Sequence, residues 1–210
     1  MKCTILSNGE YGTLSMYRSA ILQSGLIICA DGAANVLYEM ELIPHVIIGD
    51  MDSISPEVLQ YFSRQEVEII KYPSNKDYTD TQLAIAYADQ QGAEELVFLG
   101  TLGKRLDHTL SNLFSSMDMV REGKKITHYS PECMVYVFSG ELEITGNIGD
   151  IISVIALTDV CQGVYETGVA YPLEDVQLEI IKPYAVSNHL IADQATIKVR
   201  EGILAVFHYK

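Results

Sequence analysis

Two carboxylates lie one residue apart in the stretch GDMDS, where Asp50 and Asp52 follow the apolar run Val46 to Ile48. Two like charges held this close repel each other, and one of them tends to bind a proton unless a cation lies between them. A polar turn after a strand is the simpler alternative, because Asp, Ser and Gly are common turn residues. This stretch alone does not decide between the two interpretations.

Further acids stand next to the neighbouring apolar runs. Asp31 follows IICA, and the stretch SNKDYTDTQ carries Asp77 and Asp80 three residues apart, with Lys76 beside them. Helix capping by Thr79 or Asp77 is the alternative for this stretch, with Asp80 in the first turn, but capping needs only one acid. Because ligands of parallel α/β sheets bind beyond the carboxyl ends of the strands, Asp31, Asp50, Asp52 and the loop at Gly100 are expected to share one edge of the sheet.

The stretch GTLGKRLDH supplies glycine, positive charge and an acid together: Gly100, Gly103, Lys104, Arg105, Asp107 and His108. A glycine turn followed by a helix N-cap is the alternative for this stretch taken alone. Carboxylates are hard ligands that suit Mg²⁺, which is usually bound by one or two of them plus substrate phosphates. The combination predicts phosphoryl transfer, which relies on metal, cations and positioning. Neither a GxxxxGK[ST] nor a GxGxxG motif is present.

The elements that position these residues follow two patterns along the chain. Up to about residue 125, short apolar runs alternate with helical segments, which predicts an α/β domain with a mostly parallel sheet. Strands are expected at 3–9, 26–32, 45–50, 67–73 and 95–100, and helices at 11–25, 33–42, 55–65, 77–92 and 105–123. Ser55 is expected to cap the third helix.

The second pattern predicts a small all-β sandwich or barrel of about 80 residues. Strand-like segments at 125–131, 134–140, 141–146, 150–158, 163–173, 176–183 and 195–209 alternate with turn residues. The last segment is interpreted as a hairpin around Glu201 and Gly202. The chain is therefore expected to form an α/β domain over residues 1–125 and a β-sandwich domain over residues 126–210.

Composition narrows the class of partner. The 210 residues are 48% hydrophobic and carry a formal net charge of -14, which disfavours nucleic acid as a partner. No apolar run reaches the roughly 20 residues that span a bilayer, and the N-terminus predicts no secretory signal. Four scattered cysteines without a CxxC pair are expected to be reduced and buried, as in a cytoplasmic protein.

In order along the chain, ADGAA, GDMDS, KDYTD, GTLGKRLDHTLSN, GVAYPL and VSNH closely resemble the thiamine pyrophosphokinase family, from Asp31 to the C-terminal strands. The resemblance implies a Mg²⁺-dependent enzyme that transfers pyrophosphate from ATP to the hydroxyl of thiamine and releases AMP. It also implies a homodimer, with the active site between the α/β domain of one subunit and the sandwich of the other.

The resemblance also implies roles for individual residues. Those implied for Mg²⁺ and catalysis are Asp50, Asp52 and Asp80, with Asp107 as a further catalytic acid. Those implied for ATP are Asp31, Ser53, Lys76, Asp77, Thr79, Gly100, Arg105 and His108. Those implied for thiamine are Asp107, Tyr171, Ser187 and Asn188, with the Tyr171 ring stacking on the substrate. Asp107 and Asp80 are both candidates for a general base, and the choice stays open.

The chain departs from the family pattern at Ala33, Lys104 and His189, which stand where Gly, Gly and Glu are usual. None of these changes removes an expected metal ligand, so an active enzyme is expected. Two other functions remain as alternatives. A Mg²⁺-dependent transferase with a different acceptor would use the same acids, whereas GVAYPL and SNH favour thiamine. A sensor without catalysis would be expected to lose the metal acids, and Asp50, Asp52 and Asp80 are all present.

Overall fold

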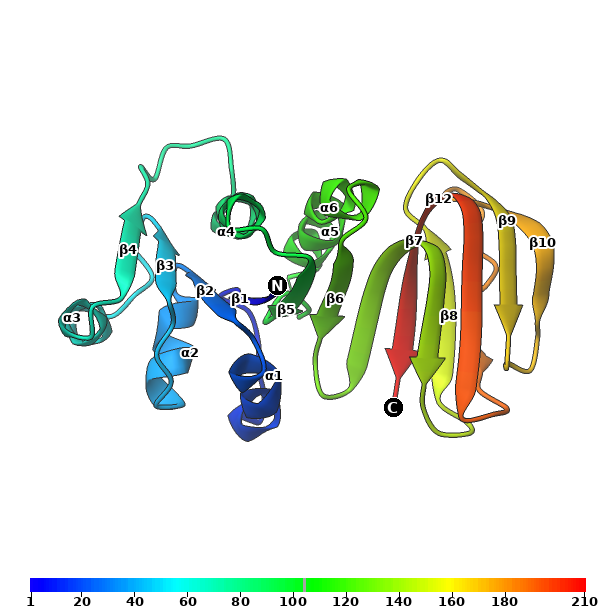
Figure 1. Cartoon of the computed structure of the whole chain (residues 1–210), viewed down its shortest axis with the longest axis horizontal. Helices are drawn as coiled ribbons and strands as arrows, with labels where there is room; N and C mark the ends of the chain where they lie inside the picture. Colours follow the sequence, from blue (N-terminus) through cyan, green and yellow to red (C-terminus); the bar gives the residue numbers. More distant parts are fainter. Residues whose placement is uncertain (104) are drawn as a thin grey trace. The chain divides into compact units, whose positions relative to one another are not determined.

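A computed structural model describes residues 1–103 and 105–210 of the chain (Figure 1). The positive charge predicted for Lys104 lies outside the described residues. The chain divides into two compact units. The first comprises Met1–Ser115 with His128–Pro131, and the second comprises Ser116–Thr127 with Glu132–Lys210. The domain boundary expected at residue 125 stays a prediction.

The first unit is built on a parallel sheet. Its strands are β1 (Lys2–Leu6), β2 (Leu26–Ala30), β3 (Val46–Gly49), β4 (Glu68–Lys71) and β5 (Glu95–Leu99), in the spatial order β5-β1-β2-β3-β4. Continuous apolar runs suit parallel strands that are covered on both faces, and β2 and β3 are buried along their whole length. The predicted α/β fold class is confirmed.

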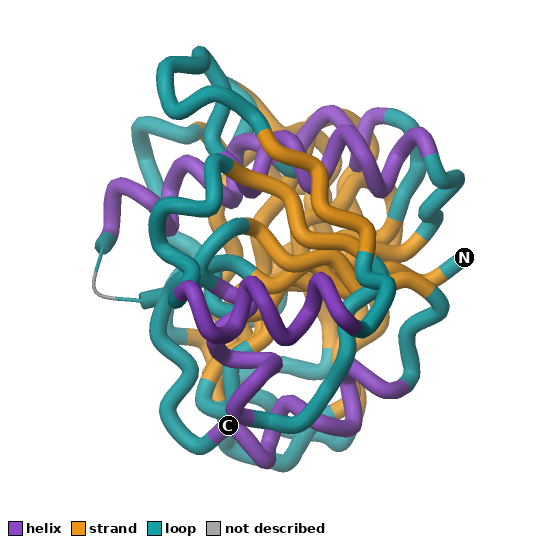
Figure 2. The backbone as a smooth tube through the Cα atoms, turned by 90° about the vertical axis from the view of Figure 1, so that its left-hand side faces the viewer, coloured by secondary structure: helices purple, strands orange, loops and turns teal. Residues whose placement is uncertain are grey.

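Helices cover both faces of this sheet. They are the 3₁₀ helix η1 (Leu14–Tyr17), α1 (Arg18–Leu22), α2 (Ala33–Glu39), α3 (Pro56–Arg64), α4 (Asp80–Gln90) and α5 (Leu106–Ser115). Figure 1 shows α1 and α2 on one side of the strands and α4 on the other. Figure 2, a view turned by 90°, shows helices on both sides of the strands. The Ser55 side chain accepts a hydrogen bond from Val58 N–H at the start of α3, as predicted.

One predicted helix is wrong in its extent. The segment 105–123 forms α5 and then a separate helix α6 (Met117–Arg121). The interruption falls at Ser116, which is completely buried. Serine competes for backbone hydrogen bonds and favours helix ends over helix interiors, which helical spacing of apolar residues does not reveal. Gly123, the last residue of the predicted segment, lies after α6 and has a positive φ.

The second unit is antiparallel. After α6 it contains β7 (Cys133–Thr145), β8 (Ile151–Ala156), β9 (Val160–Thr167), β10 (Leu173–Glu179), β11 (Asn188–His189) and β12 (Gln194–Tyr209), while β6 (Lys125–Tyr129) crosses the division between the units. The first half of β12 pairs with β7 and β9, and its second half pairs with β7 and β8. The long strand β12 thus pairs with β9 through its first half and with β8 through its second half. Apolar side chains of all these strands form one core.

Two predictions about these long strands are wrong. Residues 134–140 and 141–146 form the single strand β7, and residues 194–209 form the single strand β12 instead of a hairpin. The pairing of β12 with β7 shifts between Val199 and Leu204, so the REG turn signal marks a bulge. Gly202 accommodates it with a φ of 108°, and a Cβ there would lie 2.6 Å from the Cys161 sulfur.

A buried histidine supports the end of β5. His128 in β6 is fully buried, its ring stacks on Phe98 at a centroid distance of 4.6 Å, and its Nδ1 lies 2.9 Å from the Thr101 hydroxyl. Burial disfavours the charged imidazolium and lowers the pKa of His128 from 6.5 to about 3.

This burial predicts how stability depends on pH. Below pH 6.5 the unfolded chain binds a proton on this side chain that the folded chain does not accept until the pH approaches 3. The free energy of unfolding should therefore fall as the pH decreases through that window, by on the order of 1.4 kcal/mol per pH unit from this group. Urea unfolding of the wild type and of His128→Gln, compared at several pH values, should show the smaller slope in the variant. Equal slopes in the two proteins would contradict the assignment of this pH dependence to His128.

Candidate active site

A cavity of about 650 Å³ lies beyond the carboxyl ends of β1, β2, β3 and β5 in the first unit. The order β5-β1-β2-β3-β4 places the reversal of strand order between the parallel strands β1 and β5, and ligands of open α/β sheets bind at such a reversal. The volume is in the range of small-molecule sites. Ten of the residues predicted for the site line it: Asp31, Asp50, Asp52, Ser53, Lys76, Thr79, Asp80, Gly100, Arg105 and His108.

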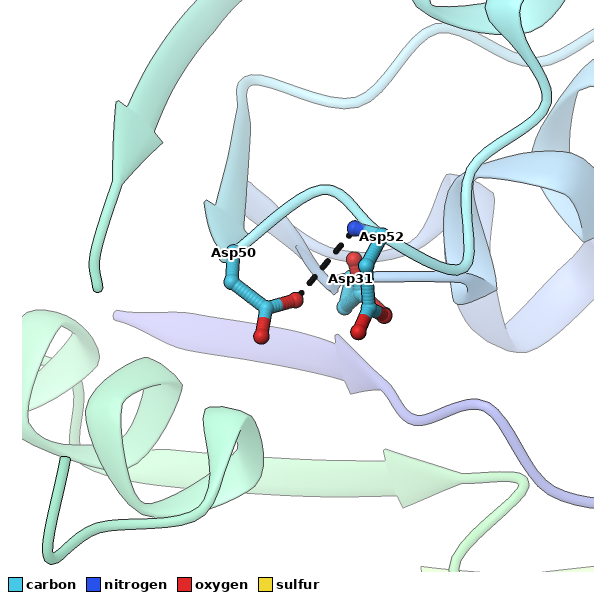
Figure 3. Close-up of side chains that lie close together, drawn as sticks. All are labelled: Asp31, Asp50 and Asp52. Carbon is cyan, nitrogen blue, oxygen red and sulfur yellow. Dashed lines mark hydrogen bonds between the residues drawn. The ribbon is translucent and has the colours of Figure 1, made fainter. Parts of the chain in front are cut away.

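Three acids converge in this cavity. Carboxylate oxygens of Asp31, Asp50 and Asp52 lie within 4.8 Å of one another (Figure 3). Asp31 is 6% exposed, and within the described part of the chain its Oδ1 is buried without a hydrogen-bond partner. A buried oxygen without a donor is costly, and a bound cation would satisfy it. The donor set is made of hard oxygens, so these residues fit Mg²⁺.

The backbone brings these acids together in unusual conformations. Asp31 has a φ of 46° and Met51 a φ of 69°, a region that non-glycine residues seldom adopt. At the end of β3, a Cβ on Gly49 would lie 2.8 Å from the Cβ of Asp31. A side chain at position 49 would thus push Asp31 out of the cluster. Strained residues that gather at one place are characteristic of functional sites.

Hydrogen bonds hold the GDMDS loop and favour its charged form. The Asp52 N–H donates to Asp50 Oδ1 at 3.3 Å, and the Ser53 hydroxyl donates to Asp52 Oδ1 at 2.9 Å. The pKa of Asp50 lies below its usual value, chiefly because the Ser74 side chain hydrogen-bonds to it and then because of the Asp52 N–H. Partial desolvation opposes this shift. Asp50 is therefore an ionised carboxylate, ready to bind a cation.

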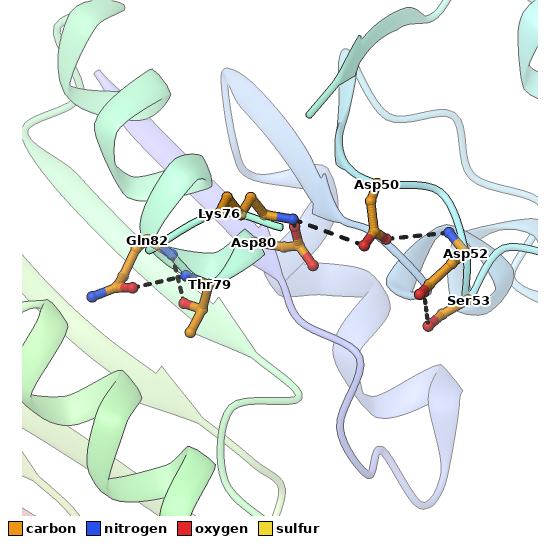
Figure 4. Close-up of polar contacts among 7 residues, drawn as sticks. All are labelled: Asp50, Asp52, Ser53, Lys76, Thr79, Asp80 and Gln82. Carbon is orange, nitrogen blue, oxygen red and sulfur yellow. Dashed lines mark hydrogen bonds and ion pairs between the residues drawn. The ribbon is translucent and has the colours of Figure 1, made fainter. Parts of the chain in front are cut away.

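Lys76 partly neutralises the acids of the cavity. Its ammonium lies 3.0 Å from Asp80 Oδ1 and 4.0 Å from Asp50 Oδ2 (Figure 4). The pKa of Asp80 is nevertheless raised, mainly by burial and also by the charges of Asp31 and Asp50, whereas Lys76 acts in the opposite direction. Of the two caps considered for α4, Thr79 is the one observed. It forms a capping box with Gln82, and each side chain accepts a hydrogen bond from the other residue's N–H.

Two predicted site residues of the first unit do not line the cavity. Asp77 is exposed to solvent just before Thr79. Asp107 forms a two-point ion pair with Arg105, at 3.0 Å and 2.6 Å. The Arg105 guanidinium lowers the pKa of Asp107 well below its usual value. Arg105 does line the cavity, so Asp107 lies one contact away from it.

Sequence reasoning missed the loop after β1. Ser7, Asn8, Gly9 and Glu10 line the cavity, but this stretch carries no cluster of acids that would mark it. The Tyr11 hydroxyl donates to the carbonyls of Ser7, at 2.7 Å, and Leu99, at 3.2 Å. This loop and the end of β5 are thereby joined. The signal that could have found it is Gly9 in the loop after the first strand, at the reversal of strand order.

Further residues of the cavity lie inside the quoted stretches ADGAA, SNKDYTDTQ and GTLGKRLDHTLSN, but no role was predicted for them individually. They are Ala30, Ser74, Tyr78, Thr81, Thr101, Leu102, Thr109 and Asn112. Gly103, named with the glycine stretch, also lines the cavity. Thr101 and Asn112 are linked, since the Asn112 amide donates to the Thr101 carbonyl at 3.1 Å.

The remaining predicted residues belong to the second unit. Tyr171 is 71% exposed, and its ring meets that of His189 edge to face at a centroid distance of 6.2 Å. Ser187 is exposed and has a φ of 60°, while Asn188 is buried in β11. Tyr171 lies in the loop between β9 and β10, and an exposed ring there is suited to stacking on a flat ligand.

Clustered carboxylates and glycine loops at the carboxyl ends of parallel strands are typical of transferases that handle nucleotide phosphates. Two protein-family models match the chain, and they identify one family within this class of transferases. Residues 17–128 match the thiamin pyrophosphokinase catalytic domain, and residues 141–204 match the thiamin pyrophosphokinase vitamin B1 binding domain.

Individual relatives agree with the family models. Thiamine pyrophosphokinase 1 of Oryza sativa subsp. japonica is 27% identical over 83% of this chain and 74% of its own length. Thiamine pyrophosphokinase of Bacillus subtilis (strain 168) is 27% identical over 85% of each chain. In fold, the crystal structure of Bacillus subtilis thiamine pyrophosphokinase matches with a TM-score of 0.89 and 23% identity, over 100% of this chain and 99% of that chain.

A more distant structure, thiamin pyrophosphokinase from Candida albicans, has a TM-score of 0.83 and 18% identity, over 100% of this chain and 89% of that chain. The chain belongs to the thiamine pyrophosphokinase family. Members of this family are transferases that form thiamine diphosphate with ATP, so the predicted enzyme class is confirmed. None of the described helices is long and apolar enough to cross a membrane.

The contact between the two loops at the β1–β5 reversal generates a prediction. A Cβ on Gly9 would lie 1.9 Å from the Gly100 carbonyl oxygen, so Gly9→Ala must displace one of the two loops. We expect a loss of about 1–3 kcal/mol in the free energy of unfolding, as for other overpacked sites, together with a raised KM for ATP. Gly25→Ala is the matched control, because its Cβ would meet its nearest neighbour at 3.7 Å. Equal behaviour of the two variants would contradict the contact.

Proposed function

We propose that this chain transfers the pyrophosphoryl group of ATP to the hydroxyl of thiamine, giving thiamine diphosphate and AMP in a Mg²⁺-dependent reaction. The observation that carries the proposal is the cluster of Asp31, Asp50 and Asp52 in a cavity of the family's catalytic domain. The bond from the thiamine oxygen to the β-phosphorus forms, the bond from that phosphorus to the α,β-bridging oxygen breaks, and the hydroxyl proton is released.

We propose that Asp50, Asp52 and Asp80 hold Mg²⁺, with Asp31 as a further oxygen donor of the same cluster. Bound Mg²⁺ would neutralise phosphate charge as it develops during transfer. Asp50 supports this role because its lowered pKa keeps it charged. Asp80 is aligned by its ion pair with Lys76.

For ATP we propose binding through the loops around the cavity, by Ser53, Lys76, Asp77, Thr79, Gly100, Arg105 and His108. Lys76 lies beside both Asp50 and Asp80, so its ammonium can contact a phosphate placed between those acids. Arg105 is held in place by Asp107 and supplies a second cation at the cavity. These contacts position the polyphosphate with little covalent chemistry from the protein.

For thiamine we propose Asp107 and the second-unit segment that carries Tyr171, Ser187 and Asn188, which falls in the range matched by the vitamin B1 binding model. We further propose a homodimer with the active site at the interface between two copies, because a two-fold dimer is the commonest assembly and the family resemblance implies one. Four buried free cysteines support a cytoplasmic location.

The purified protein, mixed with ATP, Mg²⁺ and thiamine, should yield AMP and thiamine diphosphate, identified by chromatography. Asp52→Asn removes one charge from the carboxylate cluster and should not lower the melting temperature, because it relieves repulsion, but it should lower kcat by at least about 10²-fold through lost electrostatic stabilisation. Asp159→Asn, an exposed acid outside the cavity, is the matched control. Formation of ADP would overturn pyrophosphoryl transfer, and full turnover in Asp52→Asn would overturn the metal assignment.

A further inference from the structure

The side chain of Asn188 is fully used inside the second unit. Its Nδ2 donates to the Tyr171 carbonyl at 2.8 Å and to Glu166 Oε2 at 3.2 Å. Its Oδ1 accepts from the N–H groups of Tyr171 and His189, each at 3.0 Å. An amide has two donor hydrogens and two acceptor lone pairs, so no position remains for a substrate atom. Two N–H groups face the oxygen and two acceptors face the nitrogen, which also fixes the orientation of the amide.

Through these bonds the Asn188 side chain pairs with the Tyr171 backbone as the backbone of a neighbouring strand would. The segment before Tyr171 pairs with the chain after Asn188, through the Val169–Leu190 bridge and the bond from Ala170 N–H to the His189 carbonyl. At Tyr171 the pairing continues through the Asn188 side chain, which contacts both the N–H and the carbonyl of that residue. The backbone that carries the exposed Tyr171 ring is thereby held at both of its polar groups.

Behind this contact lies a buried acid that no step of the reaction uses. Glu166 in β9 is 1% exposed, and its side chain points to the same face as the apolar core residue Val164. Its Oε2 accepts the second hydrogen of the Asn188 amide, while Oε1 has no hydrogen-bond partner among the described residues. Burial raises the pKa of Glu166 to about 7, against the smaller effect of the Asn188 bond. A leucine here would fill the core equally well but would leave that amide hydrogen unpaired.

We infer that Glu166 and Asn188 are positioning residues that orient Tyr171 for thiamine, and that Asn188 does not itself touch the substrate. Glu166 fixes the amide of Asn188, and Asn188 fixes the backbone of Tyr171. This inference rests on the proposed function, in which Tyr171 stacks on thiamine, and it gives Asn188 a different role from the substrate contact implied by the family resemblance. His189 is one of the departures from the family pattern, and its N–H group donates to the Asn188 side chain.

A double-mutant cycle tests the inference. Glu166→Leu should raise the KM for thiamine on the order of 10-fold, comparable with one lost hydrogen bond, and leave kcat and the KM for ATP unchanged. In a Tyr171→Ala background the same change should raise the KM for thiamine less than about 2-fold, because residues that act through a shared partner are not additive. Glu166→Gln, which still offers an acceptor to Asn188, should restore the wild-type KM.

Controls separate this inference from a general loss of structure and from the proposed function. Glu174→Leu makes the same replacement at an exposed position of β10 and should change neither the KM for thiamine nor kcat.

If Glu166→Leu does not fold, as judged by thermal unfolding, Asn188→Asp takes its place in the cycle. That variant places an oxygen against the Tyr171 carbonyl. An equal rise in KM with and without Tyr171, or no rise at all, would overturn the inference. If the wild type forms no AMP, the proposed function fails, and the cycle is read from thiamine dissociation constants measured by calorimetry.

Discussion

The repulsion among clustered carboxylates is the constraint on which the first unit depends. Asp31, Asp50 and Asp52 bring negative oxygens together at the ends of two neighbouring strands, and Asp80 adds a further carboxylate to the same cavity. Folding alone gives no reason to gather these charges. They are held by a buried parallel sheet, by two residues in strained backbone conformations and by one lysine. A cation bound between these oxygens would relieve their repulsion.

The parallel sheet also decides which loops take part. The strand order β5-β1-β2-β3-β4 brings the loop after the first strand next to the loop after the fifth, although more than ninety residues separate them in the sequence. Gly9 and Gly100 approach so closely that neither loop can be altered without the other. The acids supply charge at one side of the cavity and these two glycine loops supply backbone groups at the other.

The second unit solves a different problem, which is to hold an exposed aromatic ring steady. Tyr171 gains little from burial, since most of its side chain is in contact with solvent. Its order comes from hydrogen bonds to its main chain, made by an amide whose own orientation depends on a buried acid. A polar network of this kind is costly to place in a core. Among the described residues the Asn188 amide is fully paired, and it specifies one arrangement of the Tyr171 backbone, while Glu166 Oε1 stays without a partner.

The amino-acid sequence by itself determined the α/β class, the five parallel strands, the acids at their ends and the family, because apolar runs and the spacing of polar residues are local properties. It did not reveal that residues 194–209 form one bulged strand, since the REG stretch has the composition of a turn and only pairing with β7 on both sides keeps it extended. It also did not reveal Gly9 or Glu166. Gly9 matters because the sheet places Gly100 against it, and Glu166 because β11 brings Asn188 to it. Those contacts join distant parts of the chain, so only the tertiary structure decided them.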